Sequence, residues 1–285
     1  MKRTAILLYG LAGYLLGVAA LVYLIAFLFN LVVPWTIDSG APASQFTAAL
    51  ADLGLIALFG LQHSIMARRR FKSWLTRVVP PAAERSTYML ATALVTFALC
   101  LAWQAVPGVV WQAEHPLLRQ VLLAVGLSGW GLVLVSSFLI NHFDLFGLRQ
   151  VWLHFTQRDY TPLPFKAVGL YRYLRHPIMT GVLIGVWVTP SMTTGHLIFA
   201  LGMSAYILIG VYHEERDLIR EFGAKYRQYM KLTGRFLPAW ISPASRTAPK
   251  TTGDSGNAIA AAHAATELGI SRDDLSLIPR SRVRR

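Results

Sequence analysis

The chain has few charged residues and a single cysteine, and both shortages restrict what it can be. Charged side chains make up 14% of its 285 residues, whereas a soluble domain usually carries about 25%. The single cysteine, Cys100, cannot form an intrachain disulfide, so cysteine usage indicates no redox compartment. Hydrophobic residues reach 54%. This composition excludes an ordinary soluble domain and favours a protein embedded in a bilayer.

Two kinds of sequence motif are also missing. The chain has no glycine-rich dinucleotide fingerprint. Its histidines form no His-x-x-x-His pair and have no cysteine partner, whereas metal ligands normally come as a spaced cluster. We therefore expect no bound metal or haem.

Lysine and arginine are absent from segments 34–45 and 107–118 but gather in segments 68–85 and 142–176. This alternation follows the positive-inside rule and predicts that both termini and the two basic segments are cytoplasmic. The net charge of +13 then reflects a basic surface beside anionic lipid, and we expect no nucleic-acid partner. The predicted location is a bacterial-type inner membrane.

Four apolar runs are long enough to cross a bilayer. They cover residues 4–33, 46–67, 86–106 and 120–141, and Asp52 is the only charged residue in them. The first run is too long for the apolar core of a cleavable signal, and no small-x-small site closes it. We therefore predict an all-α polytopic membrane protein in which residues 1–141 form four spanning helices.

A fifth apolar run, residues 178–212, lies between Arg175-His176-Pro177 and Glu214-Glu215. As one straight helix it would be about 50 Å long, well beyond the roughly 30 Å hydrocarbon core of a bilayer. Residues 190–195 interrupt it with a proline and a glycine. These features predict a helical hairpin that enters and leaves the membrane on one side, with His176 near Glu214.

The residues around this hairpin suit a polar binding site. Proline is favoured at the first turn of a helix, so His176 should lie at a helix N-terminus, where free N–H groups attract carboxylates. Arg175 can pair bidentately with a carboxylate. A carboxylate at membrane depth, such as Glu214 or Glu215, is costly and usually marks a site. The alternative is that these residues only mark the interface and the two acids form a solvated pair.

The remaining polar part of the chain should lie in the cytoplasm. We expect residues 142–241 to comprise a cytoplasmic segment, the hairpin and an amphipathic helix that ends near Gly234, where glycine can close it. Residues 242–285 are rich in Ser, Thr, Ala, Pro and Arg, and we expect a mostly disordered tail.

Taken together, these pieces resemble the isoprenylcysteine carboxyl methyltransferase superfamily of integral membrane methyltransferases. The shared pattern is Arg-His-Pro, a hairpin, Glu-Glu, Phe-Gly-x-x-Tyr-x-x-Tyr from Phe222, and Arg-Phe-x-Pro from Arg235. In the N-terminal half, Leu-Gln-His-Ser at 61–64 and Asn-His-Phe-Asp-Leu-Phe-Gly at 141–147 look like the methanethiol S-methyltransferase branch, close to NnrU-type proteins. The resemblance spans about residues 55–240. Met179 stands where relatives often have tyrosine, which makes an isoprenylcysteine acceptor less expected.

The resemblance implies methylation of methanethiol, a small volatile thiol, to dimethyl sulfide, with S-adenosylmethionine bound at the cytoplasmic side. The implied cofactor-binding residues are Tyr171, Arg175, His176, Pro177, Glu214 and Glu215. The candidate catalytic residues are Arg235, Glu215 and His142. A cation or a base near the thiol would favour its thiolate, which is the nucleophile.

Three alternatives stay open. A methyltransferase of the same fold could act on an isoprenoid thiol or carboxylate, or on a phospholipid. A membrane reductase could use a nicotinamide cofactor without a glycine-rich fingerprint. The NnrU likeness also allows a non-catalytic membrane protein of nitrogen-oxide metabolism.

Overall fold

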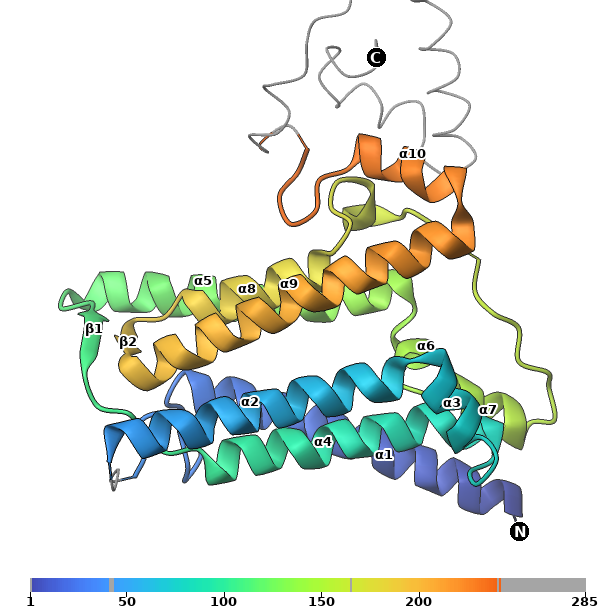
Figure 1. Ribbon diagram of the computed structural model, residues 1–285, viewed down its shortest axis with the longest axis horizontal. Helices are drawn as coiled ribbons and strands as arrows, with labels where there is room; N and C mark the ends of the chain where they lie inside the picture. The colour runs from blue at the N-terminus through green and yellow to red at the C-terminus, as the bar shows by residue number, and fades with distance from the viewer. Residues whose placement is uncertain (1, 41–43, 165, 240, 242–285) are drawn as a thin grey trace, which may run out of the picture. The chain divides into compact units, whose positions relative to one another are not determined.

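The computed structural model describes residues 2–40, 44–164, 166–239 and 241, so the predicted tail at 242–285 lies outside the described residues. Helices dominate the described part (Figure 1). They are α1 (Lys2–Leu28), α2 (Gln45–Ala67), α3 (Arg69–Leu75), α4 (Glu84–Ala102), α5 (Pro116–Ile140), α6 (His142–Leu145), α7 (Leu148–Phe155), α8 (Pro177–Trp187), α9 (Thr194–Phe222) and α10 (Ala224–Leu232). Two short strands, β1 (Val109–Gln112) and β2 (Ser191–Thr193), pair antiparallel.

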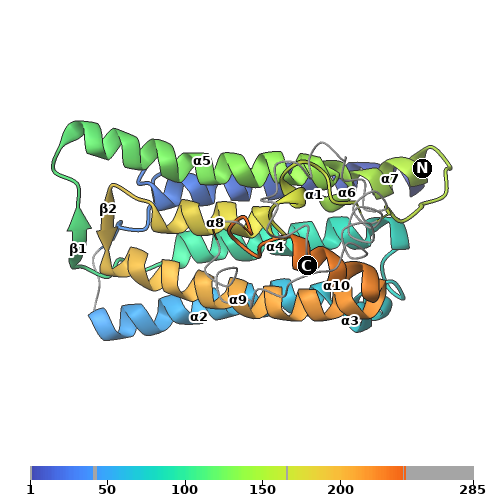
Figure 2. The same ribbon diagram turned by 90° about the horizontal axis from the view of Figure 1, so that it is seen from above.

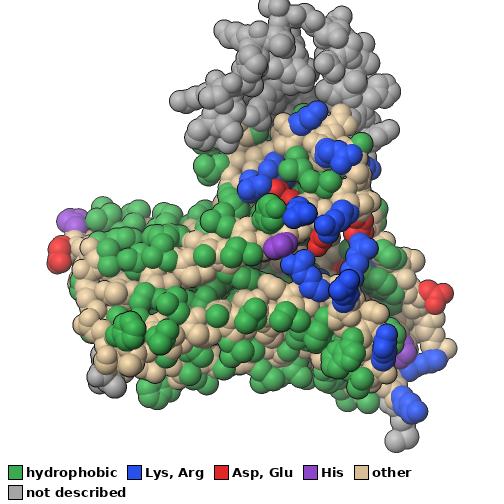
Figure 3. All heavy atoms as spheres, viewed as in Figure 1, with side chains coloured by type: hydrophobic (Ala, Val, Ile, Leu, Met, Phe, Trp, Pro, Cys, Tyr) green, Lys and Arg blue, Asp and Glu red, His purple; other side chains and the backbone are tan. Residues whose placement is uncertain are grey.

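Five of these helices are long and apolar enough to cross a membrane: α1, α2, α4 with its preceding turn, α5 and α9. Hydrophobic side chains cover much of the visible surface of these helices (Figure 3). Leu58, Leu61 and Leu94 are among the exposed ones. Such surfaces are stable against lipid rather than water. The predicted all-α polytopic membrane fold is confirmed.

The chain forms two compact units. The first contains residues 1–131, 141–161 and 182–208. In it α1 and α2 both pack against α4 (Figure 2). Glycines let α1 approach its neighbours closely: a Cβ on Gly13 would lie 3.0 Å from the Ser86 carbonyl oxygen, and one on Gly10 would lie 2.5 Å from Val151. Small residues at helix contacts are typical of packing inside membranes.

The first helix ends at Leu28, short of its predicted end at residue 33. Asn30 has a φ of 53°, a left-handed conformation that asparagine tolerates better than most residues. The Ile37 N–H then donates to the Phe27 carbonyl at 3.1 Å. The apolar run therefore continues past the helix because the chain folds back on the helix end.

The predicted hairpin is present between α8 and α9. The Pro190–Gly195 break contains β2, which pairs with β1. Beyond the turn, the imidazole Nε2 of His196 lies 2.9 Å from the Val186 carbonyl oxygen. The Trp187 indole donates to the Ser204 hydroxyl at 2.9 Å. These bonds join the end of α8 to the start of α9 and fix the reversal.

Helix α9 continues to Phe222, beyond the predicted end of the apolar run. The residues after Tyr212 are mainly helix formers such as Glu and Arg, so nothing stops the helix there. Gly223 follows the helix and separates it from α10, and its φ of 58° suits glycine. The amphipathic segment is therefore shared between the end of α9 and α10, which ends at Leu232 near its predicted boundary.

Candidate functional site

The predicted cofactor site lies in the second unit, which contains the described residues of 132–140, 162–181 and 209–241. Its frame is a short backbone pairing between the segment before α8 and the segment after α10. The Arg175 N–H donates to the Gly234 carbonyl at 2.8 Å, and the Gly234 N–H donates to the Tyr173 carbonyl at 3.1 Å. The His176 N–H donates to the Arg235 carbonyl at 3.2 Å. Arg175, His176 and Arg235 are thereby held side by side.

Gly234 is sterically required in this pairing. A Cβ at this position would overlap the carbonyl oxygen of Leu237. Backbone cannot yield as a flexible side chain can, so a larger residue would push the two segments apart. The Tyr229 hydroxyl secures the same junction by donating to the Tyr171 carbonyl at 2.6 Å.

Glu215 is the buried centre of the site, with 4% of its surface exposed. Its Oε1 accepts from Arg175 Nε at 2.8 Å and lies 3.3 Å from His176 Nε2. Its Oε2 accepts from Arg235 Nη2 at 2.6 Å. A carboxylate with charged partners on both oxygens satisfies the requirement that buried charges be paired. Glu215 therefore fixes the positions of two cations and an imidazole.

Glu214 differs from its neighbour because its side chain is 51% exposed. Its Oε2 lies 3.6 Å from His176 Nδ1. Tyr171 is also near: burial, and then the Glu214 carboxylate, raise the pKa of the Tyr171 phenol. Glu214 thus presents an accessible carboxylate beside an imidazole and a phenol. The predicted proximity of His176 and Glu214 is confirmed.

Arg175 was predicted to contact the cofactor, but its side chain is buried and bonded to other residues of the protein. Its side chain is 9% exposed and donates to Glu215 and to the carbonyls of Met230 and Thr233. The guanidinium is thus occupied within the protein, where it closes the end of α10. Arg235, with 45% of its side chain exposed, is the more accessible of the two cations.

Pro177 is the first residue of α8 and is fully buried. It lacks an N–H, which at this position would have no helical partner. One turn later the Thr180 hydroxyl lies 2.9 Å from the Phe236 carbonyl oxygen and 3.1 Å from that of His176. Thr180 therefore ties the first turn of α8 to the segment after α10.

Replacing Thr180 with valine should lower the free energy of unfolding by about 1 kcal/mol, the usual net worth of such a hydrogen bond. Thermal unfolding of the purified protein measures this. Thr180→Ser keeps the hydroxyl and should lose clearly less stability. If serine and valine behave alike, the hydroxyl does not make this tie.

His142, the third candidate catalytic residue, belongs to the first unit. Its Nε2 lies 3.0 Å from the Tyr14 hydroxyl, and its ring stacks on Phe146 with centroids 4.5 Å apart. Only 5% of its surface is exposed, and burial lowers the pKa of the imidazole. A catalytic role for His142 stays a prediction, since these contacts also suit a packing role.

The lowered pKa of His142 predicts acid sensitivity. The folded protein binds this proton less readily than the unfolded chain, so the stabilisation is complete above the unfolded pKa of about 6.5 and declines as the pH falls below it. His142→Gln should therefore lose less stability than the parent protein between pH 7 and pH 5. Melting temperatures at the two pH values test this, and equal losses would contradict it.

Several residues that build the site were not predicted to be part of it, namely Thr180, Tyr229, Thr233 and Gly234. The Thr233 hydroxyl donates to the Tyr229 carbonyl at 2.7 Å and closes α10. The sequence signals were present but unspecific: a threonine four residues after His176, and a glycine after a helix. Neither shows which distant segment is the partner.

The exposed groups of the site can hold a polar, charged ligand. Glu214 can accept hydrogen bonds from an ammonium group or from hydroxyl groups, and Arg235 can bind an anion such as a carboxylate or a thiolate. Among the described residues, no group of three or more His, Cys, Asp or Glu side chains lies together that could hold a metal ion.

Several curated proteins are similar to this chain over most of its length. "Methanethiol S-methyltransferase" of Mycobacterium tuberculosis is 45% identical over 238 residues, which cover 84% of this chain and 98% of that protein. "Methanethiol S-methyltransferase 1" of Bradyrhizobium diazoefficiens is 46% identical over 231 residues, 81% of each chain. "Nurim" of Sus scrofa is 32% identical over 196 residues, 65% of this chain and 72% of that protein.

No protein-family model matches the chain, and no solved structure matches it. The relatives show the family, because the alignment covers nearly the whole of the mycobacterial protein. This chain is a membrane protein that belongs to the methanethiol S-methyltransferase family.

Proposed function

We propose that this protein transfers a methyl group from S-adenosylmethionine to methanethiol and releases dimethyl sulfide. The observation that carries the proposal is the cluster of Glu214, His176 and Arg235 around buried Glu215, at the end of an apolar hairpin. The names of the similar bacterial proteins support the acceptor. Such a cluster joins a polar site for a charged cofactor to helices that suit an apolar substrate.

Bound S-adenosylmethionine would supply a methyl group activated by a sulfonium. The chain's own residues would then bind and orient. Glu214 would accept from the ammonium group or the ribose hydroxyls, and His176 and Tyr171 would line the same place. Arg175 and Pro177 would contribute by fixing the start of α8, where His176 is held.

Arg235 would face the acceptor, with Glu215 holding its guanidinium in position. A cation beside the acceptor sulfur lowers the pKa of the thiol and favours the thiolate. The displacement then needs the thiolate in line with the methyl group at about 3–3.5 Å. The candidate bases for the thiol proton are His176, His142 and Glu215; both oxygens of Glu215 already accept from arginines, so an imidazole would be the better acceptor.

Localisation follows the same reasoning. We propose that the protein lies in a bacterial-type inner membrane with both termini cytoplasmic, because the basic residues follow the positive-inside rule. The cofactor would enter from the cytoplasm, where a soluble charged molecule is available, and the thiol would partition from the lipid.

An acceptor screen tests the proposal. Membranes containing the protein are incubated with S-adenosylmethionine labelled in its methyl group, together with methanethiol, a prenylated cysteine or added phosphatidylethanolamine. The expected result is label in the volatile fraction with methanethiol only. Label in the prenylated cysteine or in the lipid would contradict the acceptor, and no transfer to any of them would contradict the activity.

A further inference from the structure

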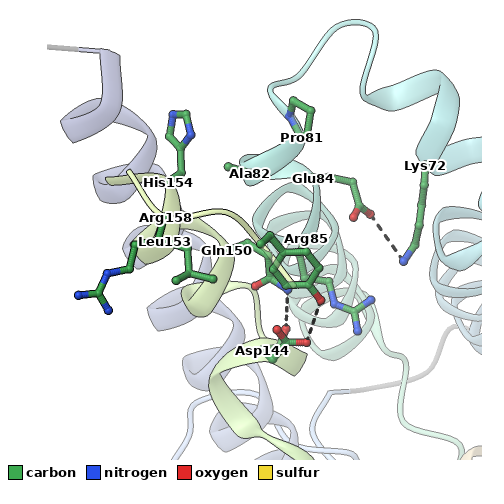
Figure 4. Close-up of a pocket in the computed structure, with 11 residues that line it drawn as sticks. Lys72, Pro81, Ala82, Glu84, Arg85, Asp144, Gln150, Leu153, His154 and Arg158 are labelled. Atoms are coloured by element: carbon green, nitrogen blue, oxygen red, sulfur yellow. Dashed lines mark hydrogen bonds and ion pairs between the residues drawn. The ribbon is translucent and has the colours of Figure 1, made fainter. Parts of the chain in front are cut away.

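A second polar site lies in the first unit, away from the residues used above. It is a pocket of about 400 Å³ where the start of α4, the helix α3 and the helix α7 meet. Figure 4 shows Lys72 and Glu84 on one side of it, Leu153 and His154 on the other, and Arg85 between them. The proposed methyl transfer uses none of these residues.

The residues that line this pocket carry more positive than negative charge. Lys72, Arg85 and Arg158 line it together with two carboxylates. One carboxylate, Asp144, is already paired with Arg149 at 2.8 Å. The other, Glu84, lies 3.9 Å from the Lys72 ammonium, which is beyond hydrogen-bond distance. An anion in the pocket would therefore meet cations that their protein partners only partly neutralise.

Lys72 in particular would gain from a bound anion. Two-thirds of its side chain is covered, at 32% exposure. Burial, and then the neighbouring Arg85, lower the pKa of its ammonium group. An anion beside Lys72 would stabilise its charged form, because it would replace the lost hydration and offset the repulsion from Arg85.

The pocket also contains acceptors that lack donors. Within the described part of the chain, Glu84 Oε1 and Gln150 Oε1 are buried and have no hydrogen-bond partner. Buried acceptors normally have a partner. A ligand with hydroxyl groups next to its anionic group would satisfy them as well as the cations.

The Asn-His-Phe-Asp-Leu-Phe-Gly block builds one wall of this pocket. The Asn141 side chain accepts from the Asp144 N–H at 3.1 Å and starts the short helix α6. Gly147 has a φ of 88°, and a Cβ there would lie 3.0 Å from the Ser86 nitrogen. The block thus forms a tight turn that carries Asp144 and Gln150 to the start of α4.

Two features place the pocket at the depth of lipid headgroups. The spanning helix α2 ends at Ala67, and the next spanning segment begins at Pro81, so the pocket lies at the ends of two membrane spans. Trp74 on α3 and Trp152 on α7 are both more than half exposed, and tryptophan is enriched at membrane interfaces. On α7, Trp152 and Phe155 are exposed on one side while Gln150 and His154 line the pocket.

We propose that this pocket binds the headgroup of an anionic phospholipid of the phosphatidylglycerol type. The phosphodiester would lie against Lys72, Arg85 and Arg158. The glycerol hydroxyls would donate to Gln150 and Glu84. Such a site would hold one lipid at the junction of α3, α4 and α7 and stabilise the first unit.

Native mass spectrometry of the full-length protein in detergent tests this by counting bound lipids. The protein is titrated with dioleoylphosphatidylglycerol and, separately, with dioleoylphosphatidylcholine. Lys72→Gln and Arg158→Gln should each weaken phosphatidylglycerol binding about tenfold, the usual effect of losing a charge-assisted bond. Glu84→Gln should strengthen it, because the competing carboxylate next to Lys72 is removed. The matched control is Arg70→Gln, which removes an exposed charge from the same helix as Lys72 and should leave binding unchanged.

Three results would overturn the proposal. An equal loss in Arg70→Gln would show general surface charge in place of a site. Equal binding of phosphatidylcholine would show that the anionic charge is not recognised. Displacement of phosphatidylglycerol by millimolar inorganic phosphate would make the pocket a site for soluble phosphate.

Discussion

Replacing Glu215 with alanine should both destabilise the second unit and abolish methyl transfer. The change leaves Arg175 buried without its carboxylate and releases Arg235 and His176. Breaking a buried ion pair by removing one partner costs about 3–5 kcal/mol, a large part of the total stability of a typical domain. Thermal unfolding and limited proteolysis of residues 209–239 measure the loss, and a methyl-transfer assay measures the activity.

A matched control is available on the same helix. Glu221 is an exposed glutamate on α9, and Glu221→Ala should leave both stability and activity close to those of the parent protein. A Glu215→Ala protein that melts at the parent temperature would contradict the role of Glu215 as the centre of the site. Glu215→Gln should fall between the two, because the amide keeps the shape but cannot neutralise two arginines.

Replacing Glu214 with glutamine should weaken cofactor binding but, unlike the change at Glu215, should leave the fold intact. The side chain is half exposed and, among the residues that the structure describes, has His176 alone within ion-pair distance, so little stability depends on it. Loss of a charge-assisted hydrogen bond to the cofactor should weaken S-adenosylmethionine binding by about tenfold or more. Isothermal titration of the purified protein measures the affinity.

Asp217→Asn is the control for this prediction. Asp217 lies on the same helix and also carries an exposed carboxylate, which pairs with Arg220 at 3.0 Å. It should bind the cofactor like the parent protein. Unchanged affinity in Glu214→Gln, or an equal loss in Asp217→Asn, would place the cofactor elsewhere.

The hairpin and its polar ends could be predicted from the sequence because both depend on simple lengths. Residues 178–212 are too long for one passage of the bilayer, and residues 190–195 are the natural place to turn. Once the chain reverses there, His176 and Glu214 return to the same side of the membrane. The 3.6 Å between His176 Nδ1 and Glu214 Oε2 agrees with that expectation.

The roles of Arg175 and Glu215 within the site could not be predicted in the same way. Which carboxylate is buried depends on the rotation of α9 about its axis. The apolar run does not indicate which face of the helix is buried at its polar end. The register that joins residues 173–176 to 234–235 depends on a loop conformation that Gly234 permits. Sequence patterns of helices contain no information on such loop-to-loop pairing.

The Asn-His-Phe-Asp-Leu-Phe-Gly block shows the same limit. Its residues supported the resemblance, but their physical role depends on a positive φ at Gly147 and on the ion pair between Asp144 and Arg149. Neither feature produces a periodic pattern in the sequence. The end of α1 at Leu28 was missed for a similar reason, since Asn30 turns the chain while the apolar composition continues.

The most direct test of the proposed function is the production of dimethyl sulfide. Membranes containing the protein are sealed with S-adenosylmethionine and methanethiol, and the headspace is measured by gas chromatography. The parent protein and Asp217→Asn should release dimethyl sulfide, and Glu214→Gln should release far less at low cofactor concentration. Parent membranes that release no more than membranes without the protein would contradict the central claim.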